Sequence, residues 1–148
     1  MKISYLIFFV ALSTNVFAQS EDSTSQEIYE WFHVTEKAEF TGGDSAREKF
    51  IQDNIDIPEV VLNSDEDIHC LIIVRFVVNQ DGALSNVHVE ENMSPCKNEY
   101  LIDAAVEVVK KMPKWKPAMI DGKPVRMQFI LPIRVNIDGE TKPRKKKK

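Results

Sequence analysis

The sequence has 148 residues, of which 43% are hydrophobic, with 19 Lys and Arg against 23 Asp and Glu and a net charge of −4. This length and apolar content predict one globular domain with a single core. Two cysteines are too few for a four-ligand zinc site, and an acidic domain gives no reason to expect nucleic acid as a partner.

Residues 1–18 begin with Met1-Lys2, which carries one positive charge, and continue as a short apolar run. Val16 and Ala18 stand at the −3 and −1 positions of a cleavage site, which predicts a signal peptide and a mature chain from Gln19. The alternative is an uncleaved anchor, but a membrane-spanning helix needs about 20 apolar residues and this run is shorter. The sequence therefore predicts export.

Residues 19–37 are polar and acidic, which predicts a flexible lead-in. Apolar residues within 28–34 predict either a short strand or a segment that docks on the domain. After two glycines, Asp44 or Ser45 can cap a short amphipathic helix over residues 46–51.

Residues 71–78 are rich in β-branched side chains and form the clearest predicted strand. An Asp81-Gly82 turn follows, and residues 84–90 alternate between apolar and polar side chains. Glycine supplies the positive φ that such tight turns need, so the pattern predicts an antiparallel hairpin.

Apolar residues recur at helical spacing over 99–111, and Pro113 ends that helix. Trp115, in the connection that follows, is predicted to pack on the sheet, because an aromatic of this size contributes much to a small core. The order of elements predicts an α+β fold with two helices on one face of a small three-stranded antiparallel sheet.

The last predicted strand covers residues 125–137, with apolar side chains on one face. The residues of its other face are mostly polar, and they include Arg126, Gln128, Ile130, Arg134 and Asn136. Pro132 also lies in this strand, and because proline cannot donate to a ladder, it predicts an edge strand or a bulge.

Cys70 and Cys96 remain after export. In an oxidising compartment an even pair is most simply a disulfide, but the sequence alone leaves two free thiols open, because pairing depends on the distance between the two α-carbons.

No Gly-x-Ser-x-Gly elbow and no glycine-rich phosphate loop occurs in the sequence. His88 and Glu90 share one strand face, but no further ligand follows at a fixed spacing, so we interpret them as an exposed polar face. The sequence therefore predicts a protein that is not an enzyme and carries no metal or cofactor.

An ordered set of motifs now resembles a known family. It runs from Phe40-x-Gly42-Gly43 through the hairpin to Met112-Pro113-Lys114-Trp115-Lys116-Pro117, Gly122-Lys123-Pro124-Val125 and Leu131-Pro132-Ile133. Residues 38–137 resemble the C-terminal domain of TonB, in the style of the short-linker TonB-like periplasmic proteins of Bacteroidetes-type bacteria.

The resemblance implies a periplasmic domain that contacts outer-membrane TonB-dependent transporters in TonB-dependent transport. The transporter offers an extended segment, the TonB box, which adds a strand to the sheet edge. The resemblance also implies which residues bind the partner: Arg126, Gln128, Ile130, Arg134, Asn136, Ile57 and Pro58. Thr41 and Ile57 depart from the family's usual proline and tyrosine, which affects fine specificity and not the fold.

A complete energy transducer keeps an uncleaved helix in the inner membrane and a long linker. Here the apolar segment looks cleavable and the linker is short, so the domain (38–138) is expected to be separate from the force-generating machinery. The alternative function is a structural or assembly factor of the cell envelope. It would act as a homodimer, or through a basic tail (139–148) that binds an anionic surface.

Overall fold

The computed structural model describes residues 27–64 and 66–138. The predicted signal peptide, the first part of the lead-in (19–26) and the basic tail (139–148) lie outside the described residues.

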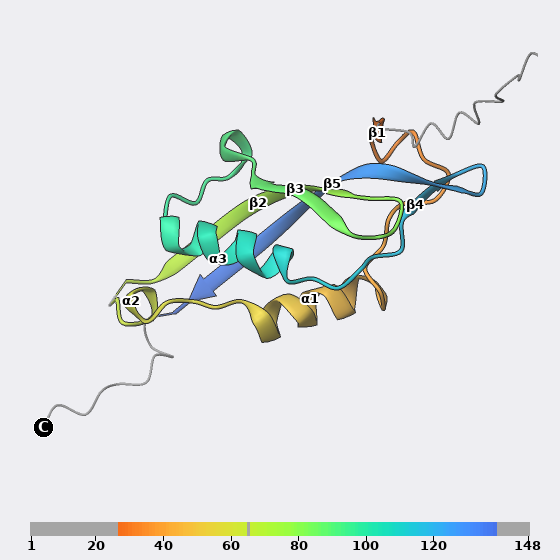
Figure 1. Ribbon diagram of the computed structural model, residues 1–148. Helices are drawn as coiled ribbons and strands as arrows, with labels where there is room; N and C mark the ends of the chain where they lie inside the picture. Colours follow the sequence, from red (N-terminus) through yellow and green to blue (C-terminus); the bar gives the residue numbers. More distant parts are fainter. Residues whose placement is uncertain (1–26, 65, 139–148) are drawn as a thin grey trace, which may run out of the picture.

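One long strand organises the sheet. β5 (Lys123–Ile137) pairs antiparallel with β2 (Ile68–Val78), from Val78 opposite Met127 to Ile68 opposite Ile137, without interruption. β3 (Leu84–Val89) pairs antiparallel with β2 and closes the hairpin predicted from the sequence. Two short strands, β1 (Ile28–Tyr29) and β4 (Ala118–Ile120), complete the order β1-β5-β2-β3, with β4 also paired to β5 (Figure 1).

The predicted α+β class is confirmed, but the predicted three-stranded antiparallel sheet is wrong. The described residues form a five-stranded mixed sheet. β4 forms because the chain folds back at Asp121 and Gly122, whose φ angles of 49° and 77° suit a tight hairpin turn. The sheet is mixed because Ile28 and Tyr29 pair parallel with Arg126 and Met127. The sequence left a short strand or a docked segment open for residues 28–34, and both descriptions hold: β1 forms, and Tyr29 and Val34 pack against the core.

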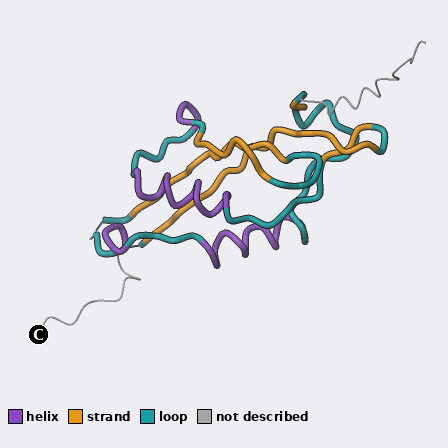
Figure 2. The backbone as a smooth tube through the Cα atoms, viewed as in Figure 1, coloured by secondary structure: helices purple, strands orange, loops and turns teal. Residues whose placement is uncertain are grey.

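The described residues form three α-helices, not the two that the sequence predicts: α1 (Gly43–Asn54), α2 (Glu59–Leu62) and α3 (Glu99–Lys110). A short 3-10 helix, η1 (Glu91–Met93), precedes α3. Figure 2 shows α1 and α3 running side by side along the strands of the sheet.

α3 is the helix that supplies the core. The side chain of Asn98 accepts a hydrogen bond from the backbone N–H of Leu101, which caps the first turn. The apolar stripe then buries five residues at helical spacing: Leu101, Ala104, Ala105, Val108 and Val109.

α1 contributes no buried residue. The predicted cap at Asp44 or Ser45 is wrong, because the helix already begins at Gly43 and its N-cap is Gly42, in a left-handed conformation (φ 95°). Asp44 instead pairs with Arg47 at 2.6 Å.

An aromatic cluster lies under one end of the sheet. Trp115 is buried, as predicted, and its ring contacts Phe40, Phe76 and Phe129 at centroid distances of 5.6, 5.3 and 4.9 Å. The backbone N–H of Trp115 donates to the carbonyl of Gly82 at 2.9 Å. A Cβ at Gly82 would lie 2.1 Å from the Trp115 carbonyl oxygen, so the hairpin turn needs glycine both for its φ of 81° and for this contact.

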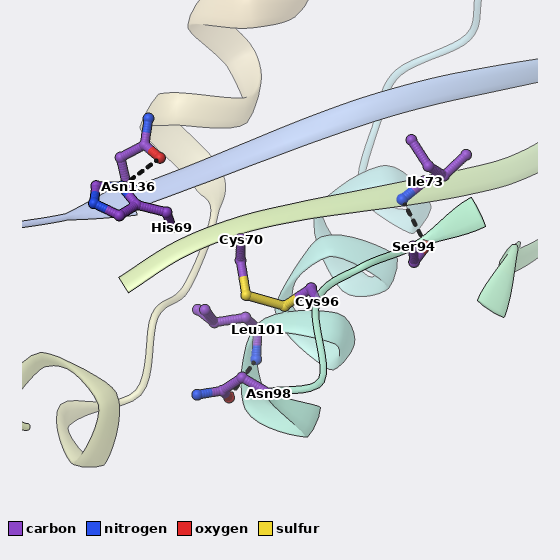
Figure 3. Close-up of a disulfide and its surroundings, with 8 residues drawn as sticks. All are labelled: His69, Cys70, Ile73, Ser94, Cys96, Asn98, Leu101 and Asn136. Carbon is purple, nitrogen blue, oxygen red and sulfur yellow. Dashed lines mark hydrogen bonds between the residues drawn. A yellow bond between two sulfur atoms is a disulfide. The ribbon is translucent and has the colours of Figure 1, made fainter. Parts of the chain in front are cut away.

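Cys70 and Cys96 form a disulfide, with an S–S distance of 2.08 Å and α-carbons 4.9 Å apart (Figure 3). The bond joins the start of β2 to the segment that leads into α3, and both residues are buried. The predicted pairing is confirmed.

Candidate functional site

β5 has two edges of different character. The inner edge faces β2. On the outer edge, β1 meets only Arg126 and Met127. No described strand pairs with residues 128–137 on this side, and no described turn or loop makes a hydrogen bond to their backbone. We call this stretch the open edge.

Hydrogen bonds on the edge of β2 that faces away from β5 determine which backbone groups of β5 point outward, along the open edge. The N–H of Ile73 donates to Ser94 Oγ at 2.9 Å, its carbonyl accepts from Glu90, and the carbonyl of Leu71 accepts from Cys96. These groups therefore point away from β5. Opposite residues of an antiparallel pair alternate between hydrogen-bonded and non-hydrogen-bonded. Ile73 and Pro132, which is opposite Ile73, form a non-hydrogen-bonded pair, so the backbone groups of Pro132 face outward.

The ladder between β2 and β5 is continuous, so this alternation extends along the strand. Within the open edge, the even-numbered residues from 128 to 136 direct their backbone groups outward, and Pro132 is the one among them that lacks an N–H. Outward donors come from Gln128, Ile130, Arg134 and Asn136. The same residues carry their side chains on the face opposite the core, since their odd-numbered neighbours 127, 131, 133, 135 and 137 are buried.

Five of the seven predicted site residues thus lie on one face of β5, in two groups. Arg126 and Gln128 are held by neighbours: Arg126 Nε donates to Asn79 Oδ1 at 3.0 Å, and Gln128 Nε2 donates to Glu30 Oε1 at 2.8 Å. Ile130, Arg134 and Asn136 are exposed.

Asn136 also lies next to His69 of β2, with Oδ1 3.3 Å from Nδ1 (Figure 3). The other two predicted residues, Ile57 and Pro58, are not on β5. Ile57 packs against the core, and Pro58 precedes α2 and lines a cavity along α3.

The cavity beside Pro58 was not foreseen from the sequence. Acidic side chains line it from two elements, Asp56 before α2 and Asp103 and Glu107 on α3. Lys110 hydrogen-bonds Glu107 at 2.8 Å and lowers the pKa of that carboxyl. No sequence motif signals this cavity, because it depends on how the α2 segment meets α3.

His88 and Glu90 make other contacts on the hairpin. Glu90 pairs with Arg75 at 2.9 Å, and the Nδ1 atom of His88 lies 2.7 Å from the carbonyl oxygen of Asn86. Across the part of the chain that the structure describes, no group of three or more His, Cys, Asp or Glu residues could hold a metal ion. None of the helices in these residues is long and apolar enough to cross a membrane.

Comparison with known proteins identifies this architecture. The family model described as Gram-negative bacterial TonB protein C-terminal matches residues 64–137. The chain belongs to this family. No curated protein and no solved structure matches the chain.

The match to the TonB C-terminal family covers β2, β3, α3, β4 and β5, and therefore the whole open edge. Domains of this family bind and transduce without catalysing a reaction, and they act in the cell envelope in connection with outer-membrane transporters. β1, α1 and α2 lie before the matched residues, although the sequence motifs suggested a resemblance from residue 38.

Proposed function

We propose that this TonB-like domain is a periplasmic binding module that receives an extended segment of an outer-membrane TonB-dependent transporter as an added strand. The observation that supports it is the open edge of β5, where a row of backbone groups has no described partner. Such an edge can pair with an incoming peptide through main-chain hydrogen bonds.

The side chains beside the open edge suit recognition of a polar, extended segment. Ile130 is 39% exposed and offers an apolar contact, and Arg134 and Asn136 offer a cation and an amide on the same face. Main-chain pairing supplies affinity in such complexes, and alternate side chains supply specificity.

A titration tests this proposal. Isotope-labelled protein is mixed with a synthetic peptide carrying the TonB box of a transporter from the host bacterium, and amide shifts are followed. We expect shifts and exchange protection concentrated at residues 128–137, with little change along β3, the opposite edge of the sheet.

The matched control is the same peptide with N-methyl groups on alternate backbone nitrogens. It keeps every side chain but loses the main-chain donors on one side, so strand addition predicts weak or no binding. Equal binding of both peptides, or shifts confined to the cavity beside Pro58, would count against strand addition.

The open edge also supports a second candidate, a homodimer that pairs two β5 strands. Sedimentation at several protein concentrations separates the two. Self-association that is lost in the Arg134→Pro variant would favour the dimer, since this substitution removes an outward N–H.

A further inference from the structure

β1 is the one described strand on the outer edge of β5, and it is short. It runs parallel to β5, with Ile28 opposite Arg126 and Tyr29 opposite Met127. If the chain continued straight, Glu30 would come to lie opposite Gln128. Instead it turns, with the N–H of His33 donating to the carbonyl of Glu30 at 3.0 Å. The open edge therefore starts where β1 ends.

The chain after β1 is attached to the domain by more backbone hydrogen bonds than β1 itself. Beyond the turn, the N–H groups of Thr35 and Glu36 donate to the carbonyl of Met119 at 2.8 and 3.1 Å, and Met119 donates back to Glu36 at 2.9 Å. Lys116 exchanges two further backbone hydrogen bonds with Glu39, at 2.8 and 3.0 Å. This part is firmly attached.

Residues 27–34, which we call the β1 segment, are attached less firmly. Tyr29 and Val34 pack against the core, but Ile28, Trp31 and Phe32 remain 40%, 57% and 61% exposed. Two side-chain contacts also hold it: Gln128 donates to Glu30, and Lys37 Nζ lies 4.7 Å from the centroid of the Trp31 ring. A two-residue strand with exposed apolar side chains gains little burial from its position, so it can detach while residues 35–39 hold the chain.

We infer that the β1 segment is a built-in competitor for the partner strand and limits the binding site to residues 128–137 until it is displaced. This inference rests on the proposed function, because it concerns how the same edge is regulated. Release of β1 extends the available edge to Arg126. β1 lies before residues 64–137, which the family model matches.

The test compares two peptides and two variants of the full chain. One TonB-box peptide is long enough to cover residues 126–137, and a shorter one covers 128–137 alone. In the Ile28→Gly/Tyr29→Gly variant, β1 loses its strand-forming side chains. The matched control, Ile28→Val/Tyr29→Phe, keeps residues that favour strands.

In the wild type and the control, we expect the two fluorescein-labelled peptides to bind alike. In the glycine variant, the longer peptide should bind roughly threefold to tenfold more tightly than the shorter, from the added main-chain hydrogen bonds. The Glu30→Ala variant, which removes only the contact to Gln128, guards against a folding defect in the glycine variant and should show a smaller gain of the same sign.

If both peptides bind the glycine and Glu30→Ala variants equally well, the inference that β1 competes with the partner strand is wrong, and the proposed function still stands. The inference is also wrong if the longer peptide already binds the wild type more tightly than the shorter one. If neither peptide binds any of these proteins, the proposed function fails and the inference falls with it.

Discussion

The two edges of β5 belong to the same 15-residue strand but are used in opposite ways. On the inner edge, every residue from Met127 to Ile137 has a partner in β2. On the outer edge, β1 meets two residues and the rest of the stretch faces no described strand. The inner edge holds the fold together, and the outer edge is the binding site that we propose.

The comparison extends to the side chains, because face and edge both alternate with a period of two along a strand. Odd-numbered residues direct their backbone toward β2 and most bury their side chains in the core. Even-numbered residues direct their backbone groups to the outer edge and their side chains to the face of the sheet opposite the core. The residues that pair with β2 and the residues that we propose to bind a partner thus alternate along one strand, so mutations can separate the two roles.

The largest expected effect is on the core below the inner edge. Phe76 is fully buried, and its ring lies 5.4 Å from that of Phe129 in β5. Phe76→Ala should lower the free energy of unfolding by about 3–5 kcal/mol through lost burial and a cavity. Urea denaturation measures this, with Ile130→Ala on the outer face as the control. A comparable loss from the control would contradict the division between the two faces.

The second-largest expected effect concerns the disulfide, which lies beside the inner edge of β5. Cys70 lies opposite Val135 in the ladder, and its bond closes a loop with a sequence separation of 26. Cys70→Ala/Cys96→Ala should reduce stability by about 2–4 kcal/mol, mainly because the unfolded chain regains freedom. Thermal unfolding with and without reductant checks it: reductant should destabilise the wild type and leave the double variant unchanged.

A proline pair tests the alternation itself. Val135→Pro removes an N–H that faces β2, so it should destabilise the protein by about 2 kcal/mol or more, since a buried ladder bond is lost. Arg134→Pro removes an N–H from the open edge, so we expect a loss below about 1 kcal/mol in stability but a clear loss of peptide binding.

Urea unfolding and peptide titration, run on both proline variants, give the two readouts. Val135→Ala controls for the lost side chain. If Arg134→Pro proves as destabilising as Val135→Pro, the assignment of inner and outer backbone groups is wrong.

The smallest effect concerns the turn at the end of β2. Lys114 Nζ lies 2.9 Å from the Asp81 carboxylate and lowers its pKa below the ordinary value of 3.8. Any stability from this contact is present above that ordinary value and is lost as the pH falls through the lowered pKa. Lys114→Met should raise the pKa of Asp81 in an NMR pH titration. Lys110→Met, the control, should raise that of Glu107 instead.

The long elements could be predicted from the sequence because each has a strong pattern of its own. The helix predicted over 99–111 is Glu99–Lys110, and the strand predicted over 125–137 is Lys123–Ile137. The alternation along that strand also placed five candidate residues on one face.

The short strands could not be predicted, because their partners lie far away in the sequence. β1 and β4 contain two and three residues, too few for a pattern, and β1 pairs with residues almost a hundred positions later. For the same reason the sequence did not indicate that β1 borders the open edge. Ile57 and Pro58 came from family motifs, and their position beside α2 depends on tertiary packing.

Pro132 has a consequence for symmetry. A foreign strand added to the open edge meets one missing donor. Two copies of this domain, paired through the same edge about a twofold axis, would each bring their own Pro132, so the defect is duplicated whenever both prolines lie in the overlap. Under the proposed function, Pro132 would cost a pair of identical domains up to two main-chain hydrogen bonds and a complex with a transporter segment only one, which favours the transporter segment.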